Sequence, residues 1–330
     1  MKFKSFIGID VSKSDFHVFI HHPGVSAKFS NDQNGFEKML AWVTDQVGTS
    51  KQQMVFAFEH TGLYSLNLSL FLDAHDYRFT MLSGLALKRS QGIVRGKSDK
   101  SDARAIAEYV YEKKEKLKLY QMPSKILLQL KRLLSYRERL VKERTAFKSR
   151  LKEYTTFLLA HEDQVLFQSH KQILACLDKD IKIVETELYR LIKQDQKLLH
   201  QFHLLNTIKC VGPQTALMMI VLTSGFTQFE TWRKFASYAG IAPFPNESGT
   251  FKARAKISHL ANKRIKTLLS NCAVSAIQHN PEMKMYYQRR VSEGKNEMST
   301  KNIIRNKLLA RIFAVIERQT PYVDTLKYAA

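Results

Sequence analysis

Cysteine and long apolar runs are scarce in this chain of 330 residues, and each shortage excludes a class of protein. The three cysteines, Cys176, Cys210 and Cys272, lie far apart and form no CxxC pair, which argues against a disulfide scaffold and a cysteine zinc site. The longest clean apolar run, residues 216–222, is much shorter than the roughly 20 residues that a membrane-spanning helix needs. The first residues lack the long apolar stretch of a signal peptide. We therefore expect a reducing compartment and no membrane partner.

Acidic residues are also scarce, with 30 Asp and Glu against 52 Lys and Arg, so the formal net charge is +22. Most of the basic surplus lies in residues 101–150 and 251–330. Clustered positive charge of this size favours a polyanionic partner, and nucleic acid is the commonest one. A hydrophobic fraction of 44% excludes wholesale disorder.

Residues 1–122 alternate between strand and helix patterns. Short apolar runs predict strands at 6–9, 16–20, near 28–29, at 54–58 and at 79–82. Helical spacing predicts helices at 36–47, at 63–74 and from Ser98 onward. Three strands followed by alternating helices and strands form the element order of a ribonuclease H-like α/β domain. In that fold the first and fourth strands are neighbours, and the last helix packs across their ends.

Residues 123–202 show two helical patterns around a break near 161–163. The first has a heptad repeat made of two interleaved series. One series recurs every seven residues and is apolar or aromatic: Ile126, Leu133, Leu140, Phe147 and Tyr154. The other is apolar apart from two arginines: Leu130, Arg137, Arg144, Leu151 and Leu158. This pattern predicts a long antiparallel coiled-coil hairpin with two arginines in its seam. The hairpin is either a plain spacer or, as we favour, an oligomerisation arm that also presents Lys and Arg.

Residues 203–330 form a third, mostly α domain. Glycine and proline concentrate between Gly240 and Gly249, which predicts an irregular loop there. Tyr286 and Tyr287 lie next to two arginines, and they either stack on nucleic-acid bases or pack in the core.

Four carboxylates lie where a phosphoryl-transfer site needs them. Asp10 and Glu59 end two predicted strands, and Asp99 and Asp102 share one face at a helix start. Converging carboxylates repel one another unless a cation compensates, and their hard oxygens suit magnesium, with manganese as a possible substitute. The plainer alternative is that these residues are caps and helix-start residues favoured by the helix dipole. Lys97, Lys100 and Arg104 fit a phosphate path beside them, or are solvated charges.

The segments IGIDVSK (7–13), FEHTGLY (58–64) and KSDKSDARAIAEY (97–109) resemble the DEDD signature of bacterial insertion-sequence-110 transposases, which the related Piv-type DNA invertases share. The segments LLNTIKCVGPQTA (204–216) and FASYAGIAPFPNESGT (235–250) are similar to the second domain of that family. Several places depart from the family pattern, among them His259 and Ala261, which replace a more usual Lys and Gly. His60 replaces a small residue, and Cys210 lies in a turn that usually carries an additional glycine.

The resemblance implies that the N-terminal α/β domain is RuvC-like, that Asp10, Glu59, Asp99 and Asp102 are its metal-binding tetrad, and that Ser248 is a nucleophile. It also implies donor and target DNA as substrates, a structured non-coding guide RNA, and a homo-oligomer, dimer or tetramer, whose active site combines two subunits. The expected location is the bacterial cytoplasm, near the nucleoid. By its local sequence alone, Ser248 is an ordinary turn serine.

We expect an RNA-guided DNA recombinase that forms a covalent phosphoserine intermediate, with Lys252, Arg254 and Lys256 neutralising charge near Ser248. Three alternatives remain. The first is a Holliday-junction-type nuclease in which the acids activate water. The second is a site-specific invertase that uses the same residues. The third is a non-catalytic nucleic-acid-binding protein, which four retained acids argue against.

Overall fold

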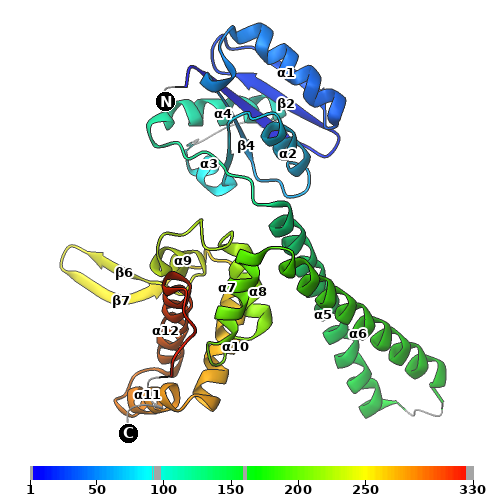
Figure 1. Cartoon of the computed structure of the whole chain (residues 1–330), viewed down its shortest axis with the longest axis vertical. Coiled ribbons are helices and arrows are strands. Elements are labelled where there is room, and N and C mark those ends of the chain that lie inside the picture. The colour runs from blue at the N-terminus through cyan, green and yellow to red at the C-terminus, as the bar shows by residue number, and fades with distance from the viewer. Residues whose placement is uncertain (1–2, 91, 93–97, 159–161, 325–330) are drawn as a thin grey trace. The chain divides into compact units, whose positions relative to one another are not determined.

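The computed structural model describes residues 3–90, 92, 98–158 and 162–324, except for the side chains of Lys252 and Arg254. The chain divides into two compact units, residues 1–122 and 123–330 (Figure 1). Each unit has a hydrophobic core of its own. No helix in the described part of the chain is both long enough and apolar enough to cross a membrane.

The first unit contains a mixed five-stranded sheet. Its strands are β1 (Ser5–Val11), β2 (Asp15–Ile20), β3 (Ser26–Ser30), β4 (Met54–Glu59) and β5 (Phe79–Leu82). They lie in the order β3-β2-β1-β4-β5. Strand β2 is antiparallel to β1 and β3, whereas β4 is parallel to β1 and β5. This ribonuclease H-like sheet confirms the fold that the order of elements predicts.

Helices pack on both faces of the sheet. They are α1 (Gln33–Val47), α2 (Leu66–Ala74), α3 (Gly84–Ser90) and α4 (Asp99–Glu112), with short 3-10 turns at Lys51–Gln53 and Lys114–Lys116. One core cluster joins alternate residues of β1 and β4 to α1 and α2. A second cluster joins the intervening residues to α3 and α4. The two faces of β1 are therefore separate environments, because successive side chains of a strand point to opposite sides.

A long antiparallel helix pair begins the second unit and confirms the predicted hairpin. It consists of α5 (Lys125–Phe157) and α6 (Gln164–Lys193). The two seam arginines are each paired across the hairpin, Arg137 with Glu185 at 2.6 Å and Arg144 with Asp178 at 2.9 Å. Both the arginines and their acidic partners are seven residues apart, so the pairs repeat with the heptad.

Shorter helices complete the second unit. They are α7 (Gln196–Asn206), α8 (Pro213–Leu222), α9 (Trp232–Tyr238), α10 (Lys263–His279), α11 (Pro281–Ser292) and α12 (Glu297–Arg318). One buried cluster contains residues from α5 to α10 and from α12, so the base of the helix pair shares its core with these helices.

The prediction of an irregular loop between Gly240 and Gly249 is wrong. This segment contains the first strand of a β-hairpin that extends away from the helices of its unit, with strands β6 (Pro243–Ser248) and β7 (Phe251–Ile257) (Figure 1). The prolines suggested a loop, but the pairing of β6 and β7 shifts register between Phe244 and Asn246, which places Pro245 at a bulge. A bulge on an edge strand tolerates proline because no ladder N–H is needed there.

Candidate active site

Strands β1 and β4 bring Asp10 and Glu59 to one edge of the sheet. The strands are parallel, and the last paired residues are Ile9 and Phe58. Asp10 and Glu59 each follow that pair by one residue, so they leave neighbouring strands side by side, where strands lie about 4.8 Å apart. Both side chains are partly buried.

Helix α4 brings the other two acids to the same edge. A Cβ on Gly8 would lie 2.2 Å from the carbonyl oxygen of Ala103, so the helix backbone lies directly on β1. The helix runs antiparallel to β1, because Ile106 and Val110 pack near Phe6, earlier in the strand. Its first turn, with Asp99 and Asp102, therefore lies toward Asp10.

A serine pair fixes where α4 begins. The Ser98 hydroxyl accepts a hydrogen bond from the Ser101 N–H at 3.2 Å, and the Ser101 hydroxyl accepts one from the Ser98 N–H at 3.0 Å. This reciprocal arrangement is a capping box with serine in place of the usual glutamate. It sets Asp99 in the first position of the helix, where the positive end of the helix dipole favours a carboxylate.

His17 is a member of this edge that the sequence analysis missed. It lies directly opposite Asp10 in the antiparallel pair of β1 and β2. Its Nδ1 is 3.8 Å from Oδ2 of Asp99, and its side chain is only 21% exposed. His17 therefore lies beside Asp10 and links it to the start of α4. The signal was present in the strand alternation, but the register of the β1–β2 pair was needed to recognise it.

The Glu59 carboxylate lies against Gly84, the first residue of α3. A Cβ at position 84 would come within 2.0 Å of Oε1 and 3.1 Å of Oε2 of Glu59. Only glycine at position 84, which has no Cβ, leaves enough space for the Glu59 carboxylate. Neither α3 nor this contact is predicted by the sequence patterns.

The four carboxylates fit magnesium or manganese by donor type, since both ions prefer hard oxygen ligands. In the described residues, no group of three or more His, Cys, Asp or Glu side chains is gathered closely enough to hold a metal ion. The structure therefore brings the acids to one sheet edge, but not into one finished cluster. We call this group of Asp10, Glu59, Asp99 and Asp102 the acidic edge.

Ser248 is in the second unit, at the end of β6. It pairs with Phe251, so the turn consists of Gly249 and Thr250. Gly249 has a φ of 56°, as the first turn residue of a two-residue hairpin requires. Every residue of β6 is exposed, so the serine hydroxyl is open to a large substrate. We call residues 243–257 the serine hairpin.

The base of the serine hairpin is fixed to the helices by side-chain amides. Asn302 and Asn306 of α12 both donate to the carbonyl oxygen of Ile241, at 2.8 and 3.0 Å. Arg305 is 9% exposed and donates to Oδ1 of Asn302 at 3.3 Å, and burial lowers the pKa of its guanidinium. On the other side, Asn262 donates to the hydroxyl of Tyr238 at 2.7 Å.

The predicted nucleic-acid contacts differ in their surroundings. Lys97 lies outside the described residues, and so do the side chains of Lys252 and Arg254. Lys100 and Lys256 are exposed, whereas Arg104 is paired with Glu108 one helical turn along α4 at 2.7 Å.

The two tyrosines of α11 are half-buried rather than displayed. Both pack against a core cluster of α10 and α12. Each ring has a lysine ammonium group over its face. The Nζ of Lys307 is 4.5 Å from the ring centre of Tyr286, and the Nζ of Lys301 is 5.8 Å from that of Tyr287. Part of the surface of each ring is therefore buried by packing against the core.

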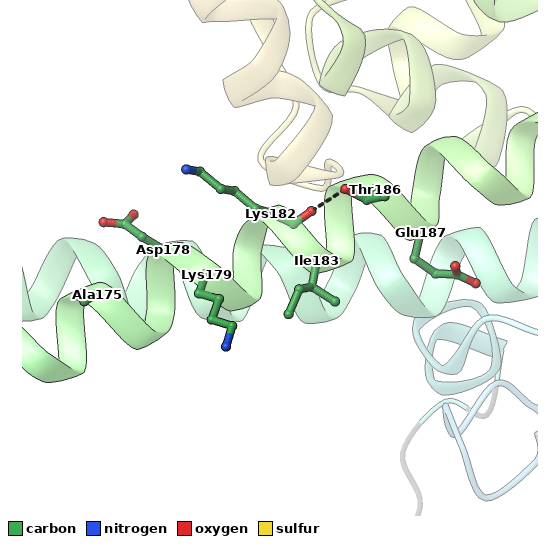
Figure 2. Close-up of a pocket in the computed structure, with 7 residues that line it drawn as sticks. All are labelled: Ala175, Asp178, Lys179, Lys182, Ile183, Thr186 and Glu187. Carbon is green, nitrogen blue, oxygen red and sulfur yellow. Dashed lines mark hydrogen bonds between the residues drawn. The ribbon is translucent and has the colours of Figure 1, made fainter.

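The outer surface of α6 has a shallow depression of about 780 Å³, shown in Figure 2. All of its lining residues come from that one helix, and none of the predicted site residues is among them. Thr186 donates its hydroxyl to the carbonyl oxygen of Lys182 at 3.0 Å, which is an ordinary bond within the helix. We assign no function to this depression.

Both halves of the predicted site lie in regions that match models of known protein families. Residues 7–158, with all four acids, match the DEDD model of IS110, described as "Transposase". Residues 202–288, with Ser248, match a model described as "Transposase IS116/IS110/IS902 family". Together the two matches cover more than two thirds of the chain.

Individual relatives give a similar result. Pilin gene-inverting proteins of Moraxella bovis and Moraxella lacunata are each 29% identical over 334 residues, covering 97% of this chain and 98% of the relative. The transposase for insertion sequence element IS1111A of Coxiella burnetii is 26% identical over 254 residues, or 68% of each chain.

Proposed function

Because this chain belongs to the IS116/IS110/IS902 family of transposases, we propose that it is a DNA recombinase that links a DNA strand covalently to Ser248. The observation that carries the proposal is the acidic edge. Asp10 and Glu59 leave adjacent parallel strands at the edge where α4 presents Asp99 and Asp102. Such an edge suits phosphoryl transfer, and an exposed serine in the matched second region offers the nucleophile.

The four acids would hold magnesium, with manganese as a substitute. When bound, the ion supplies charge that makes the scissile phosphate electrophilic and stabilises the leaving oxygen. The chain's own part is to orient the carboxylates. Gly84 leaves room for Glu59, the Ser98 cap sets Asp99, and His17 lies close to Asp99 and opposite Asp10 in the strand pair.

The proposed chemical step is a transesterification. The Oγ of Ser248 forms a bond to a DNA phosphorus while the bond from phosphorus to one deoxyribose oxygen breaks. The serine hydroxyl loses its proton, and the departing deoxyribose oxygen takes up a proton through water. A free hydroxyl of another strand then attacks the phosphoserine and restores Ser248. One ester bond replaces another at each stage, so strand exchange needs no ATP.

Guide RNA and oligomer formation are part of the same proposal. The net charge of +22 and the basic zones at 101–150 and 251–330 support binding of RNA and DNA through their phosphates. Such binding should weaken steeply with salt, and base pairing would select the target. We further propose that the acidic edge of one subunit acts with the serine hairpin of another, and that the helix pair α5–α6 joins the subunits.

A second candidate function is site-specific DNA inversion. The similarity to pilin gene-inverting proteins over 97% of the chain favours it. Inversion and transposition would use the same acids and the same serine, so they differ in the arrangement of the DNA sites. A plasmid with two sites in inverted orientation, followed by restriction mapping, distinguishes inversion from insertion of a donor segment.

A denaturing gel for a covalent protein–DNA adduct tests the proposed mechanism. The reaction contains purified protein, the RNA encoded beside its gene, donor and target DNA, and magnesium. We expect an adduct with the wild-type chain and none with Ser248→Ala or Asp10→Ala. Cleaved DNA without an adduct, at the same rate in Ser248→Ala, would replace the proposal with a water-using nuclease.

A further inference from the structure

Two large apolar side chains are exposed directly after β4. Leu63 is 72% exposed and Tyr64 is 47% exposed, and they follow Glu59 by only four and five residues. Single exposed apolar residues are common on protein surfaces and need no explanation. Two adjacent ones on a short segment next to a proposed catalytic carboxylate are a different case, provided that the segment is held in place.

Hydrogen bonds hold this segment from both of its ends. The Thr61 N–H donates to the hydroxyl of Ser65 at 3.2 Å, and Ser65 is completely buried. The side-chain amide of Asn31 donates to the carbonyl oxygen of Tyr64 at 3.1 Å. The backbone of residues 61–65 is therefore fixed, while the two side chains stay in solvent.

Asn31 also ties this segment to the strand that carries Asp10. The same amide nitrogen donates to the carbonyl oxygen of Ser12 at 2.8 Å, and Ser12 lies two residues after Asp10. The Asn31 N–H donates in turn to the carbonyl oxygen of Ser14 at 2.9 Å. One side chain thus holds together the backbone that follows Asp10 and the backbone that follows Glu59. Leu63 and Tyr64 consequently border the acidic edge.

We propose that Leu63 and Tyr64 form a platform on which DNA bases next to the scissile phosphate stack. The proposal rests on the function proposed above and adds how the strand is held. A tyrosine ring offers a flat face to any base, and such stacking is largely independent of sequence. A base beside the phosphate would be held by this platform while the acids act on the phosphate.

Nucleic-acid bases fit this surface better than a protein partner does. Two side chains expose far less area than the roughly 1,000 Å² that a specific protein interface buries. The net charge of +22 on the whole chain also favours a polyanion as its partner over a basic or neutral protein.

The test uses the full chain with its RNA, magnesium and a DNA substrate that carries 2-aminopurine beside the cleaved bond. The cleavage rate is measured in single turnover at saturating DNA, and 2-aminopurine fluorescence reports base stacking on binding. We expect Tyr64→Ala to lower the rate about tenfold and to abolish the fluorescence change. Tyr64→Phe keeps the ring and should lose far less. Leu63→Ala should lie between them.

Leu70→Ala is the matched control, because Leu70 is a 41% exposed leucine on α2 of the same unit. It should leave both readouts unchanged. Equal rates and equal fluorescence changes in wild type and Tyr64→Ala would overturn the platform. A wild-type chain that changes the fluorescence but never cleaves would overturn the proposed function, while a loss of that change in Tyr64→Ala would still support the platform.

Discussion

Asp10 and Ser248 both lie near the end of a strand, but the strands beneath them differ. Strand β1 is the central strand of five, is almost entirely buried, and has helices on both faces. Strand β6 belongs to a two-stranded sheet, and all of its residues are exposed. The acidic edge is therefore positioned by a core, whereas the serine hairpin is positioned by its base alone. An isolated hairpin has little stability of its own, so the serine should be the more mobile of the two groups.

The largest effect on stability should come from Gly8→Ala, which disturbs the packing of α4 on β1 beneath the acidic edge. The added Cβ would lie 2.2 Å from the Ala103 carbonyl oxygen and 2.5 Å from the Ala107 nitrogen, so α4 must move away from β1. We expect a loss of about 3 kcal/mol in the free energy of unfolding, measured by chemical denaturation. Gly212→Ala is the control, because nothing lies within 4 Å of a Cβ there. Equal stabilities of the two variants would contradict the close packing of α4 on β1.

Gly84→Ala tests the position of the Glu59 carboxylate in the acidic edge without a large change in the stability of the protein. The new methyl group would displace the Glu59 carboxylate, which is partly exposed and stands at the end of a flexible side chain. We expect magnesium-dependent DNA cleavage to fall about 100-fold, since a shift of about 1 Å in a catalytic group can have that effect. The thermal midpoint should change little. A variant that cleaves at the wild-type rate would show that Gly84 does not position Glu59.

The double variant Asn302→Leu, Asn306→Leu tests the base of the serine hairpin. It removes both donors to the buried Ile241 carbonyl oxygen and should reduce stability by about 2 kcal/mol. Hydrogen exchange in residues 243–257 should speed up more than exchange in β1. Asn271→Leu, at an exposed position of α10, is the control. Unchanged exchange in the hairpin would mean that these amides do not hold it.

Gly249→Ala should have the smallest effect and completes the comparison with Gly8→Ala. Alanine at a φ of 56° costs about 1 kcal/mol in the turn, but nothing lies within 4 Å of the new Cβ. Because the hairpin opens independently of the core, global stability should fall by less than about 0.5 kcal/mol. Chemical denaturation checks this value. A loss as large as that of Gly8→Ala would contradict an independently opening hairpin.

The same contrast explains what the sequence could predict. Strands β1 and β4, which carry Asp10 and Glu59, are buried on both faces and read as apolar runs, so the order of elements and the edge with these two acids were predictable. His17 and Gly84 were missed, because their roles depend on strand register and on a helix start that no periodic pattern marks. The first strand of the serine hairpin was predicted to be part of a loop, because an exposed strand with two prolines carries no burial signal.

The helix pair shows the same limit. The heptad repeat predicted the hairpin and placed Arg137 and Arg144 in its seam. The acids that pair with them, Glu185 and Asp178, lie on the other helix, and the offset between the helices cannot be read from either one alone.

The most direct test of the whole account is to locate the DNA on the protein. After the recombination reaction and digestion with nuclease and trypsin, mass spectrometry identifies the peptide that carries a nucleotide. We predict a nucleotide on Ser248 in the wild-type chain and none in Glu59→Gln, because the serine of one region needs the acids of the other. A nucleotide on Thr250 or elsewhere, or one on Ser248 that persists in Glu59→Gln, would contradict the account.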